Sequence, residues 1–384
     1  MKYSSVIKEK IQKLKPSEAI HIGHSYAIIN VAGVKIAIDP ATDNGYCPLP
    51  FSNLIADEPK YSKQLKPLIS PERLIPSAED LARNVDIIIY SHLHSDHFNL
   101  FLLSKILDMN PSIKVMVPKG TKKIIFDQNK NKRGVSLLIF RTKFFQKNFE
   151  GIFQYLNSKT PIKVAQERIC EIDDGLSIVS ENKQLEISAF DVRHPRPQFY
   201  IRLPFEEKFL PPVLGYKFSY TENSEKRKII YVAESSTDPA VLWQIWNERN
   251  GLVGVFVPVA DEKTTKGLKW FKDTYLHASL QIIGLSEILV NPTTSIHCLH
   301  QGLWYYTLDP KRVEISRIMT SGNKIYSDSD VSRALAKSKA NRHFSIKGFA
   351  HQNQAIKVIR NYVGAKYGNT VLTPIGEVFK MGKA

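Results

Sequence analysis

The sequence contains no long apolar run. None of its 384 residues lies in a stretch that approaches the roughly 18 consecutive apolar positions of a membrane-spanning helix. The first twenty residues place Val6, Ile7, Ile11 and Leu14 at helical spacing with lysines between them. This pattern lacks the apolar centre of a signal peptide and predicts a short amphipathic helix. We therefore expect a protein with no membrane span and no export.

Cysteine and several catalytic motifs are also scarce. Cys47, Cys170 and Cys298 are scattered and odd in number, which argues against a disulfide framework and favours the reducing cytoplasm. Neither G-x-S-x-G nor G-x-x-x-x-G-K-[ST] occurs, so no nucleophile elbow or Walker-type phosphate loop is indicated. No helix-turn-helix, zinc finger or RNA-binding motif is evident either.

Acidic residues are outnumbered by basic ones, 37 against 53, and the formal net charge of +16 favours anionic partners. The excess is concentrated between Lys114 and Lys163, where twelve basic residues are opposed only by Asp127 and Glu150. Six aromatic residues are interleaved with them, from Phe140 to Tyr155. Two interpretations stay open: a solvated basic helix with a buried aromatic stripe, or a cationic lid over an anionic substrate.

Hydrophobic patterns predict short strands that alternate with helices. No linker, low-complexity spacer or internal repeat interrupts them, so we expect a single compact α/β domain over residues 1–384. The expected strands are 27–31, 34–38, 85–90, 113–117, 185–192, 213–220, 229–232 and 252–257, with a further strand-like segment at 369–381. The expected helices are 99–109, 239–249, 278–289, 327–339 and 353–367.

Histidine is rare as well, with eleven in the chain, yet the stretch YSHLHSDHF places His92, His94 and His97 beside Asp96. Imidazole nitrogens and carboxylate oxygens are ligands that zinc, manganese and iron accept. On an extended loop, His92 and His94 project to the same side and can share one ion, while Asp96 and His97 can reach a second. The loop follows a buried strand, where α/β proteins usually place their chemistry. The stretch therefore predicts a metal centre.

The H-x-H-x-D-H pattern after an apolar strand resembles the signature of the metallo-β-lactamase superfamily. Residues 21–40, HIGHSYAIINVAGVKIAIDP, are similar to the opening of its lactonase-like and N-acyl-phosphatidylethanolamine phospholipase D-like branch. His24 and the Asp39-Pro40 pair match that pattern, and Tyr26 departs from the usual Ser or Thr. VPKG at 117–120 matches a V-P-x-G element of the family. The resemblance covers most of residues 20–380 and implies an αββα sandwich with the metals at one edge.

The resemblance also implies the remaining ligands. The strand-then-histidine form of ISAFDVRHPRP identifies His194, and HQGLW favours His300 over His297. Glu234 stands where relatives have a bridging aspartate, with Asp238 as the weaker candidate. The implied set is His92, His94 and His194 on one ion and Asp96, His97 and His300 on the other. Glu234 lies between the ions, binds one of them, or leaves the site mononuclear. His24 and Asp39 are assigned to support of the ligands.

By resemblance, the protein is a metal-dependent hydrolase of the metallo-β-lactamase fold. A metal-bound hydroxide would attack a carbonyl or phosphoryl centre, with the water oriented by Asp96. Two zinc ions are the default, and manganese or iron suit the same ligands. His277 occupies the position of a family histidine and is either a catalytic, substrate-side residue or a structural one.

The substrate class is indicated by the relatives and by the charge. Relatives act on lipid phosphodiesters and phosphorylated lactones, and the basic, aromatic-rich segment at 119–165 reads as an insertion that favours an anionic, phosphate-containing substrate. Two alternatives remain: a nuclease or nucleic-acid-binding protein of the same fold, and a catalytically degenerate interaction protein in which Glu234 has disabled the dinuclear centre. The sequence does not fix the oligomeric state.

Overall fold

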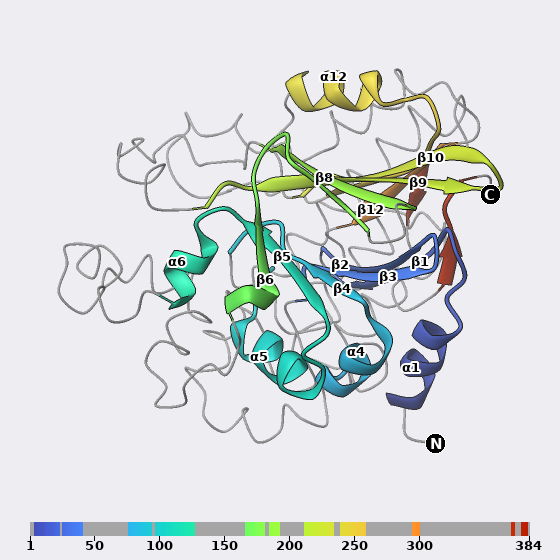
Figure 1. Cartoon of the computed structure of the whole chain (residues 1–384). Helices are drawn as coiled ribbons and strands as arrows, with labels where there is room; N and C mark the ends of the chain where they lie inside the picture. Colours follow the sequence, from blue (N-terminus) through green and yellow to red (C-terminus); the bar gives the residue numbers. More distant parts are fainter. Residues whose placement is uncertain are drawn as a thin grey trace, which may run out of the picture.

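The computed structural model describes residues 4–23, 25–40, 76–93, 97–126, 166–180, 184–192, 211–233, 239–258, 294–299, 370–372 and 378–382. Two seven-stranded sheets lie face to face, and helices cover their outer faces (Figure 1). The predicted αββα sandwich is therefore confirmed. Within the described ranges, no helix is both long enough and apolar enough to cross a membrane.

The first sheet has the strand order β14-β1-β2-β3-β4-β5-β6. The pairings from β14 through β1 and β2 to β3 are antiparallel. The pairings from β3 through β4 and β5 to β6 are parallel. The carboxyl ends of the parallel strands therefore meet at one edge of the sheet. The strands span Val378–Lys380 (β14), Glu18–Gly23 (β1), Tyr26–Val31 (β2), Val34–Ile38 (β3), Ile87–Ile89 (β4), Lys114–Pro118 (β5) and Ile169–Ile172 (β6).

The second sheet has the order β13-β12-β11-β10-β9-β8-β7 and is also mixed. Strands β10 to β13 are parallel, and β7 to β10 are antiparallel. The strands span Thr370–Leu372 (β13), Ser295–Leu299 (β12), Leu252–Pro258 (β11), Glu225–Tyr231 (β10), Leu214–Glu222 (β9), Leu185–Asp191 (β8) and Ser177–Val179 (β7).

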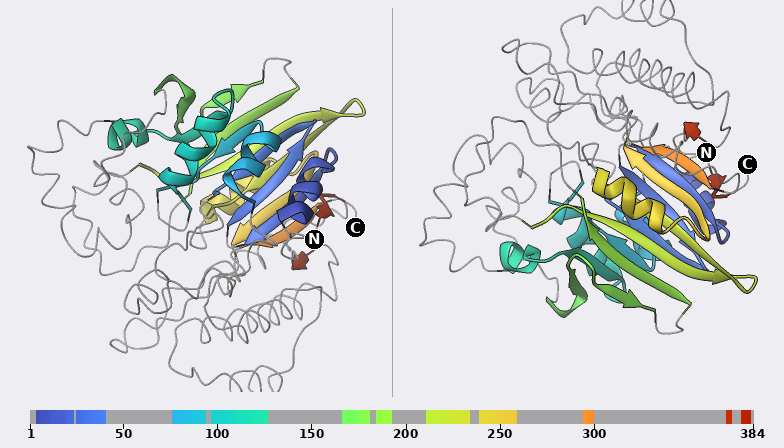
Figure 2. Two further views of the ribbon diagram at one scale, coloured as in Figure 1. Left: turned by 90° about the horizontal axis from the view of Figure 1, so that it is seen from below. Right: turned by 90° about the horizontal axis from the view of Figure 1, so that it is seen from above.

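Helices α1, α4 and α5 lie against the outer face of the first sheet, and α12 covers the second (Figures 1 and 2). Helix α4 begins with a capping box, in which the Ser77 side chain accepts from the backbone N–H of Asp80 and the Asp80 carboxylate accepts from the backbone N–H of Ser77. The helices span Ser4–Gln12 (α1), Ala78–Asn84 (α4), Leu100–Met109 (α5), Thr121–Phe126 (α6) and Pro239–Asn247 (α12), and a 3₁₀ turn spans Gln166–Arg168.

Three hydrophobic layers hold these elements together. One lies between the first sheet and its helices, one between the two sheets, and one between the second sheet and α12. Successive side chains of a strand point to opposite faces, so on β2 Ile28 packs toward the helices while Ile29 packs between the sheets. Because both faces are buried, such strands are largely apolar in sequence.

Most strand and helix predictions within the described ranges are confirmed, with ends shifted by a few residues. The predicted hairpin at 27–38 turns through Ala32 and Gly33, which both have positive φ, as a two-residue hairpin turn requires. Strands β1, β6, β7 and β12 and helices α4 and α6 were not expected. The predicted helices at 278–289, 327–339 and 353–367 lie outside the described residues. So does most of the proposed insertion, since the described chain stops at 126 and resumes at 166.

Candidate metal centre

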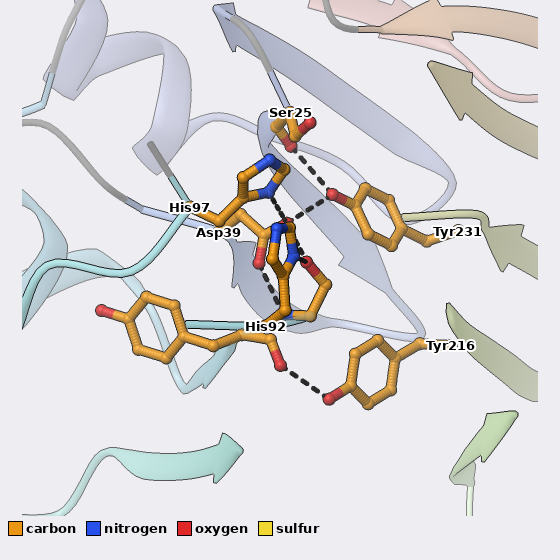
Figure 3. A network of polar contacts seen from close by, with 8 residues as sticks. Ser25, Asp39, His92, His97, Tyr216 and Tyr231 are labelled. Carbon is orange, nitrogen blue, oxygen red and sulfur yellow. Dashed lines mark hydrogen bonds and ion pairs between the residues drawn. The ribbon is translucent and has the colours of Figure 1, made fainter. Parts of the chain in front are cut away.

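The candidate site lies where two neighbouring parallel strands of the first sheet end. Asp39 follows β3, and Ser91 and His92 follow β4, which pairs with β3. Asp39 has a φ of 49°, a left-handed conformation that turns the chain away from the sheet. His97 lies just before α5. This edge therefore gathers one carboxylate, one hydroxyl and two imidazoles (Figure 3).

Asp39 is the centre of this network and is fully buried. Its Oδ1 accepts a hydrogen bond from the backbone N–H of Ser91 at 2.6 Å. Its Oδ2 accepts from the Ser91 hydroxyl at 2.6 Å, from the Tyr231 hydroxyl at 2.6 Å and from Nδ1 of His97 at 2.9 Å. Because an unpaired buried carboxylate would cost several kcal/mol, these donors are what allow Asp39 to stay charged in the interior.

A count of protons assigns the tautomers of both histidines. The Ser91 hydroxyl has one proton, and it is donated to Asp39. The 2.9 Å contact between the Ser91 Oγ and Nδ1 of His92 therefore requires that His92 donates from Nδ1. His97 also donates from Nδ1, because an ionised carboxylate only accepts. In each imidazole, Nε2 is then the nitrogen that would be offered to a metal ion.

The electrostatics of the site favour an ionised Asp39. Burial acts to raise the pKa of its carboxyl group, but the electrostatic interaction and hydrogen bond with His97, with help from His92 and Ser91, hold that pKa below its usual value. Burial, together with the nearby charge of Asp39, raises the pKa of Tyr231 well above its ordinary value. Tyr231 therefore remains a neutral hydrogen-bond donor.

The two imidazoles fit a metal ion in their chemistry. Metal-binding histidines usually donate their second ring N–H to a carboxylate or another acceptor, which fixes the tautomer and raises the basicity of the ligating nitrogen. His97 makes this contact to Asp39 directly, and His92 makes it through Ser91. The ring centroids lie 4.0 Å apart. Among the described residues alone, no group of three or more His, Cys, Asp or Glu side chains is placed to hold an ion.

The second sheet is joined to this edge by two further hydrogen bonds. The backbone N–H of Leu214, at the start of β9, donates to the carbonyl oxygen of Ser91 at 3.0 Å. The hydroxyl of Tyr216 donates to the carbonyl oxygen of Tyr90 at 2.8 Å. The base of the histidine loop is therefore held by strands of both sheets.

The structure brings together His92, His97 and Asp39 among the residues that the sequence singled out. The assignment of Asp39 to support of the ligands agrees with its contacts to His97 and Ser91. The other predicted site residues lie outside the described residues, and their roles stay predictions. These are His24, His94, Asp96, His194, Glu234, Asp238, His277 and His300.

His297, the alternative to His300 as a ligand, is described and has a different environment. It is 1% exposed and packs against Phe256 and Phe379, with ring centroids 5.1 and 4.6 Å away. Its Nε2 lies 2.7 Å from the hydroxyl of Ser295. Burial lowers the pKa of His297 from 6.5 to about 3, so it is neutral at physiological pH. These contacts favour a structural role for His297.

Three residues of the network were not singled out from the sequence. Ser91 directly precedes the motif, and its position could have suggested a role in orienting His92. Tyr231 comes three residues before Glu234 in a segment that was expected to be a strand. Tyr216 lies in another expected strand. The apolar residues around Tyr231 and Tyr216 predict that both side chains are buried. They do not predict the hydrogen bonds, because the partners are remote in the sequence.

Comparisons with known proteins identify one curated relative at moderate identity. N-acyl-phosphatidylethanolamine-hydrolyzing phospholipase D 1 of Caenorhabditis elegans is 29% identical over 113 residues. The matched region covers 29% of this chain and 27% of the relative, so it spans about a quarter of that protein. A search of protein-family models finds no match.

Solved structures of similar arrangement cover more of the chain at lower identity. A possible metal-dependent hydrolase from Veillonella parvula has a TM-score of 0.49 and 11% identity, covering 96% of this chain and 100% of that one. A metallo-β-lactamase fold protein from Bacillus subtilis has a TM-score of 0.36 and 12% identity, covering 74% and 87% of the two chains.

Proposed function

We propose that this chain, which has the αββα fold of the metallo-β-lactamase superfamily, is a metal-dependent hydrolase. The observation that carries the proposal is the buried carboxylate of Asp39, which orders two imidazoles at one sheet edge. Such an arrangement costs free energy to build, because it buries a charge and several polar groups. Packing alone does not account for these buried polar groups, whereas metal ions bound by Nε2 of His92 and by Nε2 of His97 would account for them.

The proposed ligands are the residues that the sequence assigns. His92, His94 and His194 would hold one ion, and Asp96, His97 and His300 the other, with Glu234 between them or beside one. Zinc is the preferred ion because nitrogen and oxygen ligands suit it and it needs no protection from redox chemistry, while manganese and iron fit the same set.

The chain's own groups have separate tasks in this scheme. When bound, the metal would supply Lewis acidity, which lowers the pKa of water and polarises the electrophile. Asp39 keeps the proton of His97 on Nδ1 and, through Ser91, that of His92 on Nδ1. We assign Asp96 to orienting the attacking water and carrying its proton, and His277 to the substrate side.

The substrate we propose is an anionic, phosphate-containing ester, either a phosphodiester or a phosphorylated lactone. The net charge of +16 and the basic segment around 119–165 support an anionic substrate. The curated relative is named for the hydrolysis of a phospholipid, which supports a phosphodiester.

Metal content tests the first part of the proposal. We expect the purified full-length chain to contain one to two equivalents of zinc, manganese or iron by plasma mass spectrometry. His92→Ala and His97→Ala should each lose at least one equivalent. His351→Ala, which removes a histidine outside the motif, is the matched control and should retain the wild-type content. Equal metal content in all four proteins would contradict the assignment of the site.

Activity tests the second part. With added Zn²⁺ or Mn²⁺, we expect hydrolysis of bis(p-nitrophenyl) phosphate. Reversing the charges of Lys130, Lys132 and Arg133 should raise KM at low ionic strength. The control reverses three exposed charges elsewhere, at positions 15, 226 and 380. Equal KM values for the two triple variants would show that the basic segment is not part of the substrate site. If the wild-type chain has full metal content but no esterase activity, the alternative of a catalytically degenerate interaction protein would be favoured.

A further inference from the structure

Among the described residues, one side chain of the second sheet contacts the carboxylate of the candidate metal centre. Tyr231 is the last residue of β10, and its fully buried hydroxyl lies 2.6 Å from Oδ2 of Asp39 (Figure 3). The hydroxyl has another acceptor within reach, the carbonyl oxygen of Ser25 at 3.4 Å. Because hydrogen bonds to charged acceptors are shorter and about twice as strong, the phenol's one proton belongs to Asp39.

The position of Asp39 determines the orientation of both imidazoles. Three donors converge on Oδ2, from Ser91, His97 and Tyr231. Among the described residues, the other donors to this oxygen are Ser91 and His97, which belong to the loop that follows β4 of the first sheet. The hydroxyl of Tyr231 is therefore the fixed point outside the first sheet against which the carboxylate is held.

Tyr231 also connects two parts of the chain that carry predicted ligands. His92 and His97 follow β4 of the first sheet, whereas Glu234 comes three positions after Tyr231 in the sequence. In the second sheet, Tyr231 pairs with Tyr216 on one side and Phe256 on the other, both buried between the sheets. One hydrogen bond thus joins the histidine-bearing edge to the strand that leads to Glu234.

We propose that Tyr231 is a positioning residue of the metal centre, which holds Asp39 so that His92 and His97 each present Nε2 in the orientation that binds metal. This inference rests on the proposed function, since it assumes that the site binds metal. It goes further because it makes the metal affinity depend on the hydroxyl of Tyr231, which lies on the second sheet.

Tyr231→Phe tests the proposal, and Tyr216→Phe is its matched control. Both tyrosines are fully buried, both lie in the same row of the second sheet, and each donates one hydrogen bond to the first sheet. Only Tyr231 contacts Asp39, because Tyr216 donates to a backbone carbonyl. Phenylalanine keeps the ring in the core between the sheets, and urea unfolding with far-ultraviolet circular dichroism measures the folded fraction of each variant.

The readouts are Zn²⁺ affinity by chelator competition and the visible absorption spectrum of the Co²⁺-loaded protein, both measured on the full-length folded chain. Loss of a partner that orients a metal ligand typically weakens metal affinity 10- to 100-fold. We expect Tyr231→Phe to bind Zn²⁺ about tenfold more weakly and to shift the Co²⁺ bands. Tyr216→Phe should stay within about threefold of the wild type, as expected for a change that leaves the ligands in place.

Each other outcome has a defined meaning. Wild-type affinity and spectrum in Tyr231→Phe would overturn the proposal while leaving the metal site intact. Equal weakening in both variants would also overturn it, because the effect would then belong to the spacing of the sheets. A wild-type chain that binds no Zn²⁺ or Co²⁺ would reject the metal centre itself, and this result is distinguishable from the first two.

Discussion

The buried imidazole of His297 makes the stability of the sandwich depend on pH in a way that one substitution should remove. His297 is 1% exposed and packs against two aromatic rings, and its Nδ1 finds no hydrogen-bond partner among the described residues. Burial, with a smaller contribution from the charge of His21, lowers its pKa from 6.5 to about 3. The protonated form is therefore excluded from the folded state over a wide pH range.

The sign and size of the effect follow from proton linkage. Between pH 6.5 and about 3, the unfolded chain binds a proton at His297 that the folded chain does not. The stabilising contribution is complete above pH 6.5 and is lost as the pH falls toward 3. One pKa unit corresponds to about 1.4 kcal/mol, so at pH 4.5 the free energy of unfolding should have fallen by about 3 kcal/mol from this group alone.

The perturbation is His297→Phe, which keeps an aromatic ring packed against Phe256 and Phe379 and removes the titrating imidazole. We would measure the free energy of unfolding by urea denaturation at several values between pH 7.5 and 4.5, with chelator present so that metal binding does not contribute. Other titrating groups are shared by the two proteins and cancel in the difference. The wild-type curve should fall more steeply, and the gap between the curves should change by about 3 kcal/mol across this range.

Parallel curves for the two proteins would refute the reasoning. They would mean that His297 is accessible to protons in the folded state, and hence that the core between the sheets admits water at this position. An offset that is constant with pH is expected from the lost contact to Ser295 and has no bearing on the prediction.

Three further substitutions are expected to change stability in defined directions, each measured by urea denaturation at neutral pH. Tyr90→Phe should stabilise the protein by about 1 kcal/mol, because the buried Tyr90 hydroxyl has no partner among the described residues; destabilisation would reveal a partner. Ser77→Ala should cost about 1 kcal/mol by removing the cap of α4, and a change near zero would show that the capping box is dispensable. Gly251→Ala should cost about 2 kcal/mol, because Gly251 has a φ of 76° and the new Cβ would lie 2.4 Å from the carbonyl oxygen of Lys226; a neutral result would require the turn before β11 to rearrange.

Most of the strands that the sequence predicted are buried at the majority of their positions. Strand β2 is buried at every position, and its run rich in β-branched residues was recognised directly. Strand β10 was predicted only at 229–232, although it begins at Glu225, because its first half is polar and partly exposed. The turn at Asn223 and Ser224, both with positive φ, fixes the pairing of that half with β9, a signal that hydrophobicity does not contain.

Short strands and long-range pairings were harder to predict. Strands β6 and β7 have four and three residues, which is too short for alternation to stand out. The strand-like segment at 369–381 proved to contain two strands, β13 in the second sheet and β14 in the first. Pro374 and Gly376 mark the interruption in the sequence, but nothing local indicates that the two strands belong to different sheets.

In the candidate site too, local motifs could be predicted from the sequence, whereas long-range contacts could not. His92, His97 and Asp39 could be recognised because a family resemblance attaches roles to local motifs. Tyr231 could not, because its hydrogen bond to Asp39 joins residues 192 positions apart. Ser91 could be predicted only in part. The sequence shows that it precedes the histidine motif, but the two hydrogen bonds of its hydroxyl depend on the pairing of β3 with β4.

The hydrogen bond from the backbone N–H of Leu214 to the carbonyl oxygen of Ser91, just before His92, has a thermodynamic consequence. Together with the bond from Tyr231 to Asp39, it makes the geometry of the imidazoles depend on contact between the sheets. A metal ion that binds more tightly to the ordered site must then stabilise the packed sheets against separation, by a free energy equal to its preference for the ordered site. An ion present at 100 times its Kd would add about 2.7 kcal/mol to the free energy of unfolding. Chelation should accordingly loosen the whole sandwich, including strands that lie far from the histidine loop.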